Sequence, residues 1–97
     1  MSLPIQQAES GTHGAFFVER DGERVAEMTY SKTPDGKRLI IDHTDVSESL
    51  KGQGVGKQLV AAAVAWARRD GLAVMPLCPF AKATFDKTPE FQDVLWR

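Results

Sequence analysis

Three alternate glycines lie between two lysines in the middle of the chain, in the run Lys51-Gly52-Gln53-Gly54-Val55-Gly56-Lys57. Glycine allows the backbone to turn tightly, to adopt positive φ and to approach a ligand closely. A helix that follows such a turn directs unpaired N–H groups and the positive end of its dipole into the turn. The lysines add positive charge. The run therefore predicts a site for an anion, above all a phosphate or a pyrophosphate.

Two common phosphate-binding motifs do not fit this run. The nucleotide-triphosphate loop needs a glycine at position 51 and Ser or Thr after the Gly-Lys pair, but Gln58 follows Lys57. The dinucleotide fingerprint needs a third glycine at position 57, where the chain has lysine. A glycine-rich turn that holds no ligand remains the structural alternative.

Cys78 is the first candidate for chemistry and the only cysteine of the chain. It directly precedes Pro79, where a helix is predicted to begin, and the dipole of that helix would favour a thiolate. Such a thiol could protonate a leaving group or act as a nucleophile. The alternative is a small buried apolar residue, which is the usual role of an unpaired cysteine.

His43 is the second candidate, because an imidazole can act as a general base near neutral pH. It lies in the β-branched, apolar run of residues 39–46. Strand alternation predicts that His43 shares a face with Leu39, Ile41 and Asp45, opposite Ile40, Asp42, Thr44 and Val46. On that face His43 is either a functional base or a hydrogen-bonded core group.

Composition excludes several classes of function. The formal net charge is −1 and no block of like charge occurs, which argues against nucleic-acid binding. No apolar run approaches the ~20 residues that span a bilayer, and the N-terminus does not resemble a signal peptide. One cysteine and two histidines are too few for a metal site or an internal disulfide. We expect a cytoplasmic protein that binds no metal, nucleic acid or membrane.

The elements that would position these residues form an α/β pattern. We expect one domain over residues 1–97, with residues 1–13 as a flexible or edge segment. Strands at 15–18, 25–30 and 39–46, separated by turns, predict an antiparallel meander. A helix at 55–69 and a strand at 72–75 complete a βαβ unit, so the last strand should lie parallel to the third.

Prolines determine the path of the chain beyond the parallel strand. Pro76 cannot donate to a strand ladder, so the two parallel strands are expected to part there. A short helix is predicted at 80–87, and a final strand at 91–96.

The glycine run resembles the [Q/R]-x-x-G-x-[G/A] loop of the GNAT superfamily of acyl-CoA N-acyltransferases, except that Lys51 replaces Gln or Arg. Over roughly residues 14–97 the order of elements is similar to the later part of the GNAT fold, without its two front helices. The short motifs His43-Thr44-x-Val46 and Cys78-Pro79-Phe80 are similar to motifs of minimal, single-domain GNAT-like proteins.

The resemblance implies a GNAT-like fold whose parallel strands splay around an acetyl-CoA site. It implies N-acetyl transfer from acetyl-CoA to a small-molecule or protein amine, by a monomer or homodimer. Phe85 occupies the place of the family's usual acid, a tyrosine, so catalysis would depend on Cys78, His43 or solvent. The residues implied in binding the cofactor are Val46, Lys51, Gly52, Gln53, Gly54, Val55, Gly56 and Lys57.

Two other functions remain open. The missing tyrosine and front helices also suit a CoA-binding or protein-interaction module that keeps the fold but has little or no turnover. A redox or acyl-carrier role for Cys78 is the third interpretation.

Overall fold

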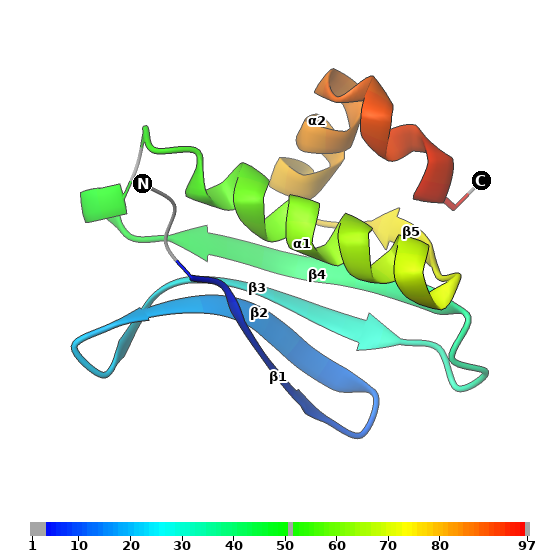
Figure 1. Ribbon diagram of the computed structural model, residues 1–97, viewed down its shortest axis with the longest axis horizontal. Helices are drawn as coiled ribbons and strands as arrows, with labels where there is room; N and C mark the ends of the chain where they lie inside the picture. Colours follow the sequence, from blue (N-terminus) through cyan, green and yellow to red (C-terminus); the bar gives the residue numbers. More distant parts are fainter. Residues whose placement is uncertain (1–3, 51, 97) are drawn as a thin grey trace.

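The structure is a computed structural model that describes residues 4–50 and 52–96. Its five-stranded sheet has the order β1-β2-β3-β4-β5, and the helices cover one face of this sheet (Figure 1). The strands are β1 (Gln6–Ser10), β2 (His13–Arg20), β3 (Glu23–Lys32), β4 (Arg38–Val46) and β5 (Ala73–Pro76). The helices are η1 (Glu48–Leu50), α1 (Val55–Asp70), α2 (Pro79–Lys87) and η2 (Pro89–Val94).

Strands β1 to β4 form an antiparallel meander, and β5 pairs in parallel with β4 after the crossover through α1. The tight turn between β2 and β3 has positive φ at both Asp21 and Gly22, 54° and 81°, as a two-residue hairpin requires. The predicted mixed α/β fold, an antiparallel meander followed by a βαβ unit, is confirmed.

The core lies between the sheet and α1, and aromatic rings fill its centre. The rings of Phe16, Tyr30 and Trp66 pack against one another with centroids 5.2–5.7 Å apart. The buried Tyr30 hydroxyl donates to Glu9 and accepts from Gln7, each at 2.8 Å. Burial is the main cause that raises the pKa of Tyr30 to about 12. These hydrogen bonds attach the edge strand β1 to the core.

Strand β4 contains one extra residue relative to β3. The pairs Thr29–His43 and Tyr30–Ile41 are consecutive, so Asp42 has no partner of its own on β3. Such a β-bulge shifts the alternation of side chains by one residue beyond it.

The bulge overturns the predicted alternation along β4. Before it, the buried Ile41 faces α1, as expected. Beyond it, Thr44 pairs with the core residue Met28 and faces the helices, whereas His43 is exposed on the opposite face of the sheet. The prediction that His43 shares a face with Ile41 is wrong, because the sequence pattern carries no sign of the inserted residue.

The ladder between β4 and β5 ends at the same place. Its last pair is Ile41–Pro76, and the Ile41 carbonyl then accepts from the N–H groups of both Leu77 and Cys78, at 3.1 and 3.2 Å. Beyond this point β4 continues to Val46 while the chain leaves the sheet for α2. The predicted parting of the parallel strands at Pro76 is confirmed.

The predicted final strand at 91–96 is wrong. Residues Pro89–Val94 form the 3-10 helix η2, and Leu95 makes a single bridge to Val74. The apolar residues Phe91 and Val94 are three apart, a spacing that places them on one side of a 3-10 helix. The Phe91 ring packs edge-on against Phe85 of α2, with centroids 5.9 Å apart.

The placement of His43 can be tested by stability. Because His43 is exposed, His43→Ala should change the free energy of unfolding by about 0.5 kcal/mol or less. Ile41→Ala, the matched change at a fully buried position of the same strand, should cost about 2–5 kcal/mol. Urea denaturation measures both. An equally large loss in His43→Ala would mean that His43 belongs to the core.

Candidate functional site

A cavity of about 630 Å³ lies between the end of β4, the glycine loop and α2. Thr44 and Val46 line it from β4, and Phe80 and Thr84 line it from α2. The predicted cofactor-binding residues that line it are Val46, Gly52, Gly54, Val55, Gly56 and Lys57. The structure therefore brings most of the predicted binding residues around one cavity. Lys51 lies outside the described residues.

The glycine loop leaves the start of α1 without a side-chain cap. Gly52 and Gly54 have φ of 84° and 72°, a left-handed conformation that favours glycine. Gly54 is the N-cap residue, and the first helical bond runs from the Gln58 N–H to its carbonyl, 3.1 Å. The N–H groups of the first turn precede that bond and have no partner within the helix. An anion in the cavity would meet these groups and the positive end of the dipole.

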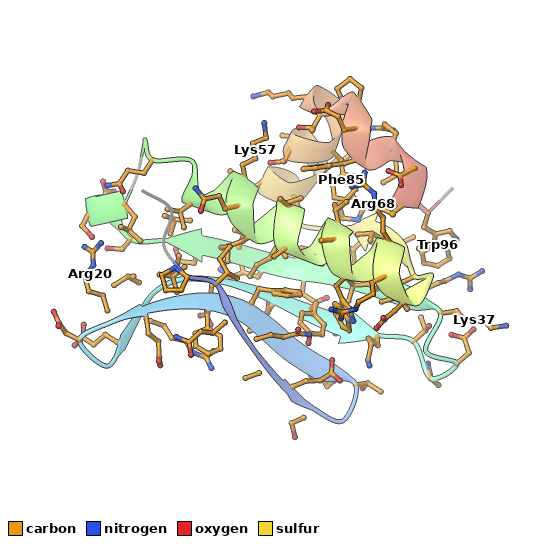
Figure 2. All side chains as sticks on the ribbon, viewed as in Figure 1. Arg20, Lys37, Lys57, Arg68, Phe85 and Trp96 are labelled. Carbon is orange, nitrogen blue, oxygen red and sulfur yellow. The ribbon has the colours of Figure 1, made fainter. Side chains whose placement is uncertain are left out.

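The side chains of the loop contribute unequally. Lys57 is exposed and extends outward from the first turn of α1, on the side of α2 (Figure 2). The Gln53 amide instead donates to the Ser49 carbonyl at 3.3 Å, and Gln53 does not line the cavity. Gln53 would therefore contact a bound cofactor through its backbone and not through its side chain.

Gly56 lets the starts of α1 and α2 approach closely. A Cβ atom at Gly56 would lie 2.4 Å from Cζ of Phe80, far inside van der Waals contact. The Phe80 ring is 44% exposed and forms a wall of the cavity. Any side chain at position 56 would displace this ring.

Cys78 directly precedes α2 and is 5% exposed, behind the residues that line the cavity. Burial opposes ionisation of its thiol. The Thr44 hydroxyl and the backbone N–H groups of Ala81, Phe80 and Thr44 outweigh burial, so the pKa of Cys78 lies below its ordinary value. The start of α2 thus favours a thiolate, the nucleophilic form of cysteine.

His43 is not brought together with Cys78. It lies on the face of the sheet that the helices leave open, outside the cavity lining. On this open face the Ser31 hydroxyl donates to Asp42 at 2.7 Å and lies 3.1 Å from Nδ1 of His13.

Thr44 is one of several cavity-lining residues that the sequence did not predict. Strict alternation places it on the face opposite Ile41, and only the bulge at Asp42 turns it toward the helices. Its hydroxyl oxygen is buried and has no hydrogen-bond partner among the described residues. By contrast, the Thr84 hydroxyl on the facing helix donates to the Phe80 carbonyl at 3.0 Å.

Among the residues that the structure describes, no three His, Cys, Asp or Glu side chains gather in a group that could hold a metal ion. In the same part of the chain, no helix has the length and apolar character needed to cross a membrane.

Residues 15–94 match the family model of the GCN5-related N-acetyltransferases. This match spans most of the chain, including the glycine loop and the splayed strands. The chain belongs to this family, whose members are N-acetyltransferases, and the GNAT resemblance of the sequence is confirmed. No match was found among curated proteins.

Solved structures agree with the family. A GCN5-like protein from Staphylococcus aureus is 37% identical, with a TM-score of 0.73, over 97% of this chain and 88% of that one. The aminoglycoside N-acetyltransferase AAC(6')-Iy, solved with CoA, is 15% identical with a TM-score of 0.61, over 97% and 91% of the two chains. A ribosomal-protein-alanine N-acetyltransferase from Brucella melitensis is 17% identical with a TM-score of 0.63, over 91% and 64%. The last two likenesses concern the fold.

The lowered pKa of Cys78 predicts how its alkylation depends on pH. The pH midpoint of its reaction with iodoacetamide should lie below that of an ordinary thiol, because polar groups of Thr44 and of the start of α2 stabilise the thiolate. The same protein in concentrated urea is the control, and its midpoint should return to that of a free thiol. Equal midpoints in the two states would contradict the inferred environment.

Proposed function

We propose that the chain binds acetyl-CoA in this cavity and transfers the acetyl group to an amine through Cys78. The observation that carries the proposal is the continuity of the cavity. It extends from the uncapped start of α1 to Thr44, the neighbour of the Cys78 thiol. An anion-binding end, and a nucleophile behind the wall of the other end, suit an acyl thioester that carries a diphosphate.

The diphosphate would bind at the glycine loop. The N–H groups of the first turn of α1 and the charged Lys57 face the cavity there. The pantetheine arm would lie along β4 beyond Ile41, where β5 has left the sheet. Val46, which lines this part of the cavity, would contact the arm through its backbone. The similar aminoglycoside N-acetyltransferase solved with CoA supports this choice of ligand.

The environment of the Cys78 thiol supports a nucleophilic role. A lowered pKa raises the fraction of Cys78 that is present as the thiolate, which is the nucleophilic form of cysteine. The sulfur would attack the thioester carbonyl carbon, forming an S-acetyl bond while the bond to the CoA sulfur breaks. The CoA thiolate leaves and takes a proton from solvent. The neutral amine then attacks the acetylcysteine, releases the Cys78 thiolate and loses a proton to solvent.

The acceptor would be an amine from a small molecule or a protein. Asp45 is exposed and lines both the main cavity and a small hollow on the open face of the sheet, beside Arg24 and Glu27. A carboxylate in this position can attract a cationic amine toward the acyl end of the cavity.

One observation favours a second candidate, a CoA-binding module with little or no turnover. Phe85 stands where the resemblance places a catalytic tyrosine, and it is 1% exposed within the core. The usual acid is therefore replaced by a packing residue. Release of thiol from acetyl-CoA, measured with a panel of polyamines, amino acids and lysine peptides, distinguishes the two functions.

Ligand binding should depend on the glycines of the loop. Acetyl-CoA and CoA should raise the melting temperature, because they bind only the folded chain. Gly54→Val and Gly56→Asp should abolish this shift, the first by bulk and strain, the second by displacing the Phe80 ring and placing an anion against the diphosphate. Gly36→Val is the matched control, since Gly36 has a similar φ of 70° but lies in a turn away from the cavity. Wild-type shifts in both loop variants would refute the assignment.

The role of Cys78 should appear in acetyl transfer rather than in binding. Incubation with acetyl-CoA should add one acetyl group at Cys78, detected by intact mass and peptide mapping, and bound CoA should protect the thiol from iodoacetamide. Cys78→Ala should keep the CoA-dependent thermal shift, lose acetyl transfer and cost roughly 1 kcal/mol of stability. Normal turnover in Cys78→Ala would show that the residue only packs.

A further inference from the structure

The hydroxyl of Thr44 is a buried polar group without a partner in the described part of the chain. Buried hydroxyls in folded proteins almost always make hydrogen bonds, because an unmet donor loses its bonds to water without replacement. Thr44 also lines the cavity of the candidate site. An unsatisfied donor in the wall of a binding cavity is a group that a ligand can satisfy.

The position of this hydroxyl indicates which hydrogen-bond acceptors it can reach. Thr44 lies beyond the bulge on β4, where the strand has parted from β5, and the start of α2 lies across the gap. The hydroxyl is close enough to the Cys78 sulfur to lower the pKa of the thiol, yet it does not satisfy the geometry of a regular hydrogen bond. It is therefore free to turn from the sulfur to another acceptor.

We propose that Thr44 is a catalytic residue whose hydroxyl stabilises the nearby Cys78 thiolate in the free protein and donates to the acyl carbonyl oxygen during transfer. The proposal rests on the proposed function. When the sulfur attacks the carbonyl carbon, negative charge moves from the sulfur to the carbonyl oxygen. A single hydroxyl beside both atoms can follow that charge by rotation about its C–O bond. Thr44 keeps its own proton throughout, and the bonds that form and break are those of the acetyl transfer through Cys78.

A catalytic role for Thr44 can be distinguished from a packing role by substitution. If Thr44 only fills space, valine, which has nearly the same shape but no hydroxyl, should replace it without chemical consequence. If Thr44 acts as a hydrogen-bond donor, serine should replace it, because serine keeps the hydroxyl and loses only the methyl group. Comparison of Thr44→Val with Thr44→Ser therefore separates the hydroxyl from the shape of the side chain. Thr29→Val is a matched control, because Thr29 lies on β3 and faces the open side of the sheet.

The first measurement is the pH dependence of Cys78 alkylation by iodoacetamide, which requires no ligand. The midpoint should move upward in Thr44→Val and return toward the wild-type midpoint in Thr44→Ser. It should stay at the wild-type value in Thr29→Val. This arm tests the contact between Thr44 and Cys78 even if the chain proves not to bind acetyl-CoA. An unchanged midpoint in Thr44→Val overturns the first half of the proposal.

The second measurement is the rate at which acetyl-CoA acetylates Cys78 in a single turnover. Loss of one donor to a developing oxyanion typically slows acyl transfer by about a hundredfold or more. Thr44→Val should show a loss of this order with an unchanged thermal shift by CoA, and Thr44→Ser should recover most of the rate. Equal losses in both variants, or none in Thr44→Val, overturn the second half. If Thr44→Val does not fold, Thr44→Ala removes the same hydroxyl without β-branching.

Discussion

The extra residue in β4 determines the arrangement of the candidate site. Asp42 is inserted next to Ile41, whose carbonyl ends the ladder with β5 by accepting two N–H groups. The bulge and the end of the ladder therefore coincide. Up to Ile41, β4 is a central strand with a partner on each side. Beyond it, the strand presents a new set of side chains to the space that β5 has left, and Thr44 belongs to that set.

Both helix N-termini that face this space are positioned to stabilise negative charge. The first turn of α1 has no side-chain cap and opens into the cavity. The first turn of α2 follows directly on Cys78, and its N–H groups help to lower the pKa of the thiol, although the side chain makes no regular capping hydrogen bond. A helix N-terminus favours an anion by about 0.3–1 kcal/mol when exposed and by about 2 kcal/mol in partly buried geometry. One helix thus suits a diphosphate, and the other a thiolate.

Side-chain packing outside the cavity holds the N-termini of α1 and α2 in place. α1 is fixed to the sheet by Trp66, which packs against Tyr30 and Phe16. α2 is fixed by Phe85, which packs against Phe91 of η2. The exposed ion pair between Arg68 and Asp93, at 2.8 Å, also joins α1 to η2, but such pairs contribute little free energy. Aromatic packing therefore contributes more than this ion pair to holding α1 and α2 in place.

The sequence by itself determined most of the elements and the glycine turn that precedes α1, because these depend on local chemistry. Glycine at positions 52 and 54 permits a left-handed backbone that few other residues adopt, and Pro76, which has no N–H to donate, ends the ladder with β4. Tertiary structure alone decided the face of each side chain beyond Ile41, because a bulge is a property of two paired strands. The same limit applies to η2, since Phe91 packs against Phe85 of α2 and the chain meets β5 only in the bridge between Leu95 and Val74. His43 and Thr44 exchanged faces for this reason, and the cavity acquired a hydroxyl where sequence alternation had placed an imidazole.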